Sequence, residues 1–329
     1  MRFFRAAPSC GYDSQDEQLE LVDRLFIKRE TQKPGFNRRM FDEDFSRMFH
    51  VTNQRDNLFE FVSNDDELTQ KLLGNVNTRY TQRSPDKTVH DLVEEIARSL
   101  VSSGRAYYFL HDDPAHQEMH IVPFSPRGVV RFFGIYIQWI PKRMEMHWDR
   151  EDEEIPREIR VLDASKVMRL DMPTSIKRML SAQNKTLDTL DKHQFEVSNF
   201  PPPATHANPN PTNQFDFRVW RDIQERALYR ATRRTGWRGR KSDSSKCSDF
   251  FSCHRLIRFR RNQLLLRNNI LKQLSGELSR IGKSCKADFS VDISATDNLS
   301  SVAHLDELEM RLASETARFN EVIDYCYGR

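Results

Sequence analysis

Glycine is scarce in this sequence of 329 residues, with 11 in the whole chain and no stretch that is rich in it. Folds that bind phosphate through glycine-rich loops usually need more. No stretch approaches the roughly 18 apolar residues of a membrane-spanning helix, and the N-terminus lacks the apolar run of a signal peptide. The five cysteines are scattered and odd in number, which is typical of reduced thiols. These shortages predict a soluble, intracellular protein.

The composition is polar for a folded protein. Hydrophobic residues make up 38% and charged residues 30% of the chain, and the mean hydropathy is -0.71. However, 22 Phe, 8 Tyr and 4 Trp are too many aromatic side chains for a globally disordered chain. The sequence predicts a core that is thin for its length, which fits an extended or assembling subunit at least as well as a compact enzyme.

Charge is distributed unevenly along the chain. The stretch from Arg218 to Lys286 holds 19 Lys or Arg and 5 Asp or Glu, whereas the remainder holds 32 basic and 43 acidic residues. One basic segment therefore lies in an otherwise acidic protein, which predicts a surface for a polyanion or for an acidic partner.

The basic segment supplies the candidate contact residues for nucleic acid or a partner. Arginines bind phosphates, and the interspersed Trp220, Tyr229 and Trp237 can stack on bases or pack within the protein. The alternative is a solvated helix face that balances an acidic neighbour subunit. The arginines between 255 and 261 are not expected inside one core, because each unpaired buried charge costs several kcal/mol. The candidates are Arg218, Arg221, Arg226, Arg230, Arg233, Arg234, Arg238, Arg240, Lys241, Arg255, Arg258, Arg260, Arg261 and Arg267.

Helix and strand patterns alternate in the first two thirds of the chain. The clearest helix carries its apolar residues on one face and ends at Gly104, as helices commonly do. Runs of β-branched and aromatic residues then predict strands, and a further helix follows. The apolar face consists of Val89, Leu92, Val93, Ile96, Ala97, Leu100 and Val101. The strands are predicted over 106–110, 120–124, 129–140, 144–148 and 159–171, and the second helix over 175–195.

The last third is the most regular. Residues 254–283 predict one long helix, 286–295 a short β segment, and 301–325 a closing acidic amphipathic helix. Apolar residues spaced by seven along the long helix predict a bundle seam. The residues expected to pack between subunits are Ile257, Leu264, Leu271, Leu274, Leu278, Ile281, Leu305, Leu308, Leu312 and Phe319.

Catalytic motifs are absent or incomplete. Gly282-Lys283-Ser284 resembles the end of a P-loop, but position 277 is Glu where that loop requires glycine, and the local pattern is a helix end. Cys247, Cys253 and His254 lack a second pair of ligands at useful spacing for zinc. The stretch 111–120, rich in His, Asp and Glu, reads as a solvated hairpin loop around Pro114. We therefore predict no enzymatic activity, no metal and no cofactor.

The residues between Glu94 and Pro141 carry a family resemblance. The sequence EEIARSLVSSGRAYYFLHDD…MHIVPFSPRGVVRFFGIYIQWIP resembles the wing region of tailed-bacteriophage portal proteins, the head-to-tail connectors. There an apolar helix ends in a glycine turn, and an aromatic strand, a proline-containing strand and an aromatic strand pair follow. Many members have Gly-Asn-Ala-Tyr after the helix. Here Gly104-Arg105-Ala106-Tyr107 takes that place, with arginine as the departure.

The last third is similar to the second part of the same family. Residues 254–283, 284–299 and 300–325 have the order and approximate lengths of two stem helices flanking a small β clip. The resemblance implies an α+β, portal-like fold, with a wing region of helices and a small mixed sheet followed by the stem and clip. The predicted segments are an N-terminal arm and helix (1–55), a wing-like domain (56–198), a proline-rich linker (199–217), a basic segment (218–253) and the stem–clip–stem (254–329).

The resemblance also implies a function. Portal proteins form a ring, commonly of twelve copies, at one capsid vertex, and double-stranded DNA is packaged and ejected through it. Their partners are the terminase motor, the capsid shell and head–tail adaptor proteins, without a membrane. The location would be the virion, and the host cytoplasm during assembly. A channel lining must hold DNA loosely, so the basic segment is expected to face the shell, a tail protein or packaged DNA.

Two other functions stay open on the sequence alone. One is a soluble nucleic-acid-binding protein that uses the region Arg218–Lys286 as its binding surface. The other is a metal-dependent hydrolase that uses the His111–His120 stretch.

Overall fold

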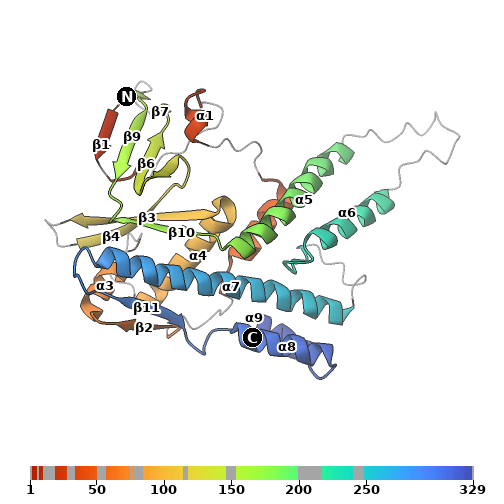
Figure 1. The fold of residues 1–329 in the computed structure, drawn as a ribbon. Coiled ribbons are helices and arrows are strands. Elements are labelled where there is room, and N and C mark those ends of the chain that lie inside the picture. The colour runs from red at the N-terminus through yellow and green to blue at the C-terminus, as the bar shows by residue number, and fades with distance from the viewer. Residues whose placement is uncertain are drawn as a thin grey trace, which may run out of the picture. The chain divides into compact units, whose positions relative to one another are not determined.

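The computed structural model describes residues 2–5, 7–9, 19–27, 34–49, 57–74, 76, 84–113, 118–145, 153–198, 217–239 and 248–327 (Figure 1). The chain divides into two compact units, each built from segments that are far apart in sequence. Unit 1 comprises 1–31, 53–172 and 267–299, and unit 2 comprises 32–52, 173–266 and 300–329. The predicted linker 199–217 lies outside the described residues, apart from Phe217, which begins α6.

Unit 1 contains the described strands, arranged in small sheets. A four-stranded sheet has the order β1-β9-β6-β5, with β1 parallel to β9 and the other pairs antiparallel. A three-stranded antiparallel sheet has the order β10-β3-β4, and β11–β2 and β7–β8 form antiparallel pairs. The strands are β1 (Arg2–Arg5), β2 (Phe59–Ser63), β3 (Arg105–Asp113), β4 (Glu118–Phe124), β5 (Val129–Phe132), β6 (Ile135–Ile140), β7 (Arg143–Glu145), β8 (Glu153–Ile155), β9 (Glu158–Leu162), β10 (Val167–Asp171) and β11 (Val291–Ala295).

Helix α4 (Pro85–Ser103) forms as the sequence predicts. The Ser84 side chain accepts a hydrogen bond from the Lys87 backbone N–H, and Pro85 occupies the first turn. The predicted apolar face is buried throughout. The helix ends at Gly104, whose φ of 78° is left-handed and whose N–H donates to the Leu100 carbonyl.

The aromatic strand after Gly104 starts the core of the sheets. β3 pairs with β4 on one side and with β10 on the other. Tyr107, Phe109, Phe124 and Tyr136 are buried in one apolar cluster. The helix–glycine–strand junction thus positions a core element, and the strands predicted over 106–110 and 120–124 are confirmed. The runs 129–140 and 159–171 each form two strands, β5 with β6 and β9 with β10.

The β segment near the end of unit 1 pairs with a strand from far earlier in the chain. β11 lies antiparallel to β2, and the Ile293 N–H also donates to the Ser275 hydroxyl. A Cβ at Gly282 would overlap the ring of Phe289, which is fully buried, so glycine allows the chain to turn closely there. The segment expected to be a clip between stem helices therefore belongs to a two-stranded sheet that the sequence did not predict.

The remaining helices of unit 1 are short. They are α1 (Asp23–Phe26) and α3 (Asp66–Gly74). Because α1 and β1 belong to unit 1 while α2 belongs to unit 2, the predicted N-terminal arm 1–55 is shared between the units.

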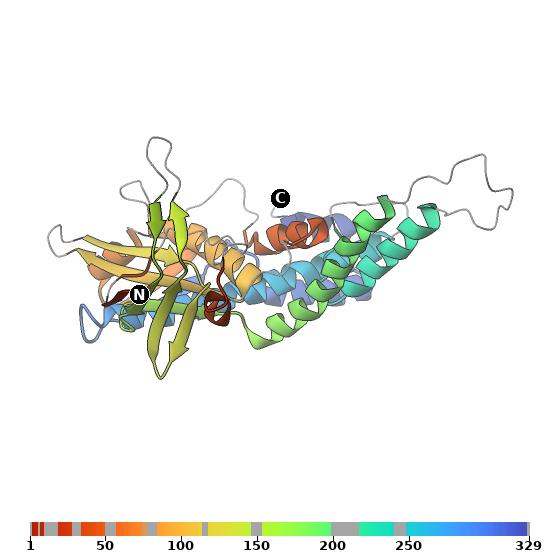
Figure 2. The same ribbon diagram turned by 90° about the horizontal axis from the view of Figure 1, so that it is seen from above.

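Unit 2 is helical among its described residues. Helices α5 and α6 lie side by side in both views (Figures 1 and 2). The long helix α7 confirms the prediction over 254–283, and the division between the units falls within it, between Leu266 and Arg267. The helices are α2 (Phe36–Ser46), α5 (Thr174–Ser198), α6 (Phe217–Ala231), α7 (Asp249–Gly282), α8 (Val302–Ala313) and α9 (Phe319–Tyr327).

The chain closes with two helices where the sequence predicted one. Glu315 has a φ of 59°, and the backbone N–H groups of Thr316 and Ala317 donate to the Arg311 carbonyl. The Arg311 guanidinium then holds Glu321 across the turn, with N–O distances of 2.6 and 2.9 Å. The single-helix prediction is wrong because this turn returns α9 to the apolar cluster that α8 already contacts.

Candidate nucleic-acid or partner interface

Helix α6 and the turn after it carry the arginines that remain at the surface. Arg226, Arg230, Arg233 and Arg234 are exposed, and Arg238 is partly exposed. Arg226 and Arg230 are four residues apart on α6, so they lie on the same side of the helix. None of the five forms an ion pair with a carboxylate among the described residues. We call these five residues the α6 arginine surface.

The turn after α6 is fixed by buried groups. Gly236 has a φ of 83°, and a Cβ there would lie 2.6 Å from the Phe259 backbone nitrogen, so only glycine fits. Trp237 is buried, donates from Nε1 to Asp44 Oδ2 at 3.0 Å and meets the Phe41 ring edge-on. Trp237 therefore packs inside the protein and does not offer its face to a base.

Arg255 on α7 binds this turn from inside the protein. Its side chain is only 3% exposed. The guanidinium donates to the Tyr229 carbonyl at 3.2 Å, the Thr232 hydroxyl at 2.6 Å and the Trp237 carbonyl. It also lies over the Tyr229 ring, 5.3 Å from the centroid. Arg255 is thus part of the scaffold that holds the end of α6.

Arg260 is also inside the protein, 6% exposed. Its Nη1 donates to Gln263 Oε1 at 2.7 Å, its guanidinium lies over the Tyr327 ring, and its Nε has no hydrogen-bond partner. Burial lowers the pKa of Arg260 to about 10, although the nearby Cys326, Tyr327 and Asp44 favour the charged form.

The expectation that the arginines between 255 and 261 avoid the core fails for Arg255 and Arg260, whereas Arg258 and Arg261 are not buried. Arg255, Arg260 and Arg267 are all buried. Backbone carbonyls, an amide oxygen and aromatic faces are among the groups that hold these guanidinium groups. These three side chains are not open to a nucleic acid or a partner.

Two further arginines of α7 are bound to α8. Arg261 Nε lies 2.6 Å from Asp306 Oδ1, and Arg258 Nε lies 3.7 Å from Glu309 Oε1. His254 Nε2 lies 3.2 Å from the same Glu309 oxygen. The basic side of α7 therefore serves largely to hold α8. The side chains of Arg218 and Arg221, and residues Arg240 and Lys241, lie outside the described residues.

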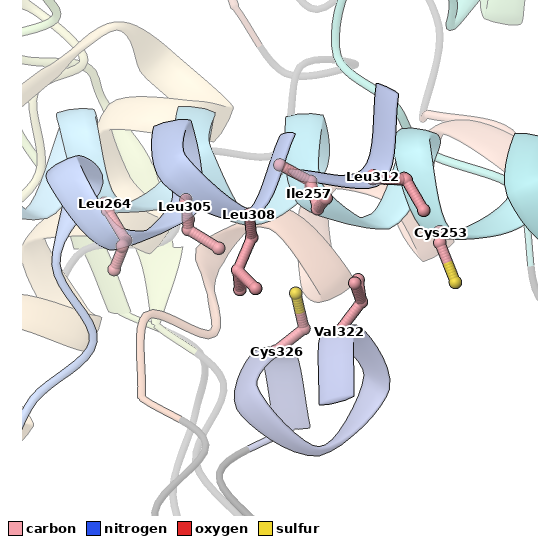
Figure 3. Close-up of a cluster of buried hydrophobic side chains, with 8 residues drawn as sticks. All are labelled: Cys253, Ile257, Leu264, Leu305, Leu308, Leu312, Val322 and Cys326. Carbon is pink, nitrogen blue, oxygen red and sulfur yellow. The ribbon is translucent and has the colours of Figure 1, made fainter. Parts of the chain in front are cut away.

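The residues predicted to pack between subunits are mostly buried within the chain. Figure 3 shows side chains from α7, α8 and α9 meeting in one cluster. Of the predicted set, Phe319 is 40% exposed, and the others are already shielded from solvent. The interpretation of this seam as a subunit contact is corrected, because these side chains are buried within one chain, where α8 covers Ile257 and Leu264 of α7. The buried members are Ile257, Leu264, Leu271, Leu274, Leu278, Ile281, Leu305, Leu308 and Leu312.

The stretch proposed for a hydrolase forms the β3–β4 hairpin, and His111 and His120 lie opposite each other in its register. His116 lies outside the described residues. Burial, with His120 and Lys166 nearby, lowers the pKa of His111, whose side chain borders a cavity of about 710 Å³. Among the residues the structure describes, no three His, Cys, Asp or Glu side chains are grouped to hold a metal ion.

Cys253, Cys285 and Cys326 are free thiols, and burial raises the pKa of Cys326 to about 12 despite the nearby Arg260. In the part of the chain that is described, no helix is both long enough and apolar enough to cross a membrane.

Comparisons with known proteins match structures only. No family model matches the chain, and no curated protein sequence matches it. The chain is similar to one in the neck of an empty GTA particle computed with C6 symmetry, with 12% identity, coverage of 89% of this chain and 88% of the other, and a TM-score of 0.35.

Two further chains come from native particles. One is from the virion of the native gene transfer agent (GTA) particle, with 10% identity, 91% and 96% coverage, and a TM-score of 0.33. The other is from the neck computed with C12 symmetry, with 10% identity, 84% and 86% coverage, and a TM-score of 0.34. The likeness spans most of the chain, but at these TM-scores it carries no argument about function.

Proposed function

We propose that this protein is a ring-forming subunit of a particle neck, a portal protein through which double-stranded DNA passes during packaging and ejection. It performs no catalysis and needs no cofactor. Its partners would be further copies of itself, DNA, the terminase motor, the capsid shell and head–tail adaptor proteins, and its location would be the virion.

The order of elements carries the proposal. Helix α4 ends at Gly104, and the aromatic strand β3 follows at once, then the proline-containing β4 and the β5–β6 pair. The long α7, the short β11 and α8 come later in the same order as the stem and clip described above.

Exposed apolar side chains also support an assembling subunit. Phe132 and Phe133 at the β5–β6 turn contact each other with ring centroids 4.5 Å apart, and Phe133 is 89% exposed. Large apolar side chains gathered at the surface are typical of protein contact sites. Since the α7–α8 seam is closed within the chain, a ring must use surfaces such as these.

Mass photometry of the purified full chain tests the proposal. A ring of about twelve copies of 38.9 kDa would weigh near half a megadalton, and negative-stain images should show a central hole. A single species of 38.9 kDa at every concentration tried would reject it.

A second function is favoured by the α6 arginine surface. Arginines without carboxylate partners are suited to bind phosphates, so a small soluble species could bind nucleic acid through them. Titration of a fluorescent DNA duplex at several salt concentrations tests this function. This function requires that DNA binding weakens steeply as the salt concentration rises. The slope of log affinity against log salt concentration should decrease when Arg226, Arg230 and Arg233 are changed to Ala.

A further inference from the structure

Two exposed helix faces of unit 2 match each other in charge and in apolar character. The α6 outer face consists of Ile223, Arg226 and Arg230, and the α8 outer face consists of Ala303, Glu307 and Met310. We propose that the α6 outer face of one copy binds the α8 outer face of the next copy. This inference rests on the proposed ring, and it names the surfaces that join its subunits.

The α6 outer face combines an apolar side chain with arginines. Ile223 is 54% exposed, and Arg226 and Arg230 follow it at the spacing that keeps all three on one side of the helix. The charge pattern of the sequence points to the arginines and gives no sign of Ile223. A phosphate backbone offers Ile223 no apolar surface, whereas a protein partner can remove it from water.

The α8 outer face is the acidic counterpart. Met310 is 67% exposed, and Ala303 and Glu307 lie within the same stripe, opposite the buried Leu305, Leu308 and Leu312. Asp306 and Glu309 are engaged by arginines of α7. Glu307 makes no such ion pair among the described residues, and the exposed Glu315 follows in the turn beyond the helix.

One copy cannot bring its own two faces together. The end of α6 is bound by Arg255 and Asn262 of α7, whereas α8 packs on Ile257 and Leu264 of the same helix. At about 100° per residue, these two pairs lie roughly 140° to 180° apart around α7. Helices α6 and α8 therefore lie on opposite sides of α7 (Figure 1), with their outer faces directed away from it.

Complementary faces on opposite sides of one subunit give a head-to-tail contact. A row of copies joined in this way keeps one free α6 face at one end and one free α8 face at the other, so assembly continues until the rotation closes a ring. Exposed ion pairs contribute little individually, about 0–1 kcal/mol each, so the apolar pair of Ile223 and Met310 must contribute to the affinity. Salt should weaken the assembly because the charges that guide it are exposed.

Charge reversal of the full chain tests the contact. One variant carries Arg226→Glu with Arg230→Glu, a second carries Glu307→Arg with Glu315→Arg, and a third carries all four changes. Mass photometry should show that each double variant falls to 38.9 kDa and that the fourfold variant recovers the assembled species. A matched control, Arg98→Glu with Arg178→Glu, reverses two exposed arginines on α4 and α5 and should assemble like the unmodified chain.

The outcomes separate this inference from the proposed function. If the unmodified chain is a monomer, the ring itself is rejected. If it assembles and the reversals on α6 and on α8 with its following turn leave the assembly intact, only the contact is rejected. If the α6 reversal abolishes binding to a DNA duplex while assembly is unchanged, the surface binds nucleic acid instead. If both double variants dissociate but the fourfold variant stays dissociated, the two faces do not pair with each other.

Discussion

The arginines of α6 and those of α7 belong to one basic segment in sequence but serve different purposes in the fold. On α6, Arg226 and Arg230 point to solvent without carboxylate partners in the described chain. On α7, Arg255 and Arg260 are buried and donate to a carbonyl, a hydroxyl or an amide oxygen. A cluster of arginines is therefore not a surface by composition alone, because the groups around each side chain decide its role.

The difference has a physical cause. A guanidinium has five N–H donors in a planar fork and can satisfy several carbonyls at once. The turn from Thr232 to Trp237 presents such carbonyls toward α7, so Arg255 is held there. No comparable group of acceptors faces the outer side of α6 in the described residues, and its arginines remain in water.

The largest effect should follow from Arg255→Met. The change leaves the carbonyls of Tyr229, Thr232 and Trp237 without their buried donor, and the unfolding free energy should fall by about 3 kcal/mol. Urea unfolding followed by tryptophan fluorescence measures it. Arg255→Lys is the matched control, because it keeps the charge but lacks the planar fork, and it should lose most of the same stability. A loss of less than about 1 kcal/mol would mean that Arg255 is not part of the scaffold.

Trp237→Phe should have the next largest effect. Phenylalanine can still pack on Phe41, but the hydrogen bond to Asp44 is lost, which should cost about 1 to 2 kcal/mol. A double-mutant cycle with Asp44→Asn measures the coupling between the two side chains. Equal effects of Trp237→Phe in both backgrounds would show that the hydrogen bond contributes nothing.

Arg260→Met should behave unlike Arg255→Met. Burial already disfavours the charge of Arg260, and the change removes the hydrogen bond to Gln263 Oε1 rather than donors to several carbonyls, so it should cost only about 1 kcal/mol. The Gln263 side chain keeps its hydrogen bonds to the carbonyls of α2 and Arg47 in either case. If Arg260→Met lowered the unfolding free energy as much as Arg255→Met, both arginines would be part of the buried scaffold.

The smallest effect should come from Arg226→Ala combined with Arg230→Ala. Exposed side chains without partners change the unfolding free energy by no more than about 0.5 kcal/mol. Thermal unfolding of the variant at a protein concentration where it is monomeric measures this. A loss above about 1 kcal/mol would reveal partners for these arginines within the chain, and the contrast between α6 and α7 would disappear.

Local patterns predicted much of the fold. The helix α4 with its terminating Gly104, the strands β3 to β6 and the long α7 follow from periodicity and residue type, which act over a few neighbouring residues. The pairing of β11 with β2 could not be predicted, because register between strands more than 200 residues apart depends on the whole core. The division of the closing segment at Glu315 was also missed, since its left-handed backbone is stabilised by the return of α9 to the core.

The candidate surface was predicted only in part. Counting charges located the basic region, but it could not separate Arg230 from Arg255, and it gave no weight to Ile223 or Met310. Exposure depends on which side of a helix another helix covers, and that is not a local property.

The amino-acid sequence by itself determined that a basic segment rich in arginine lies beside helices with a continuous apolar side, because charge and helical spacing are written in consecutive residues. Only the tertiary structure decided that α8 covers Ile257 and Leu264 on that apolar side and that Arg255 and Arg260 lie inside. The free energy of a buried guanidinium depends on acceptors that the rest of the chain brings to it.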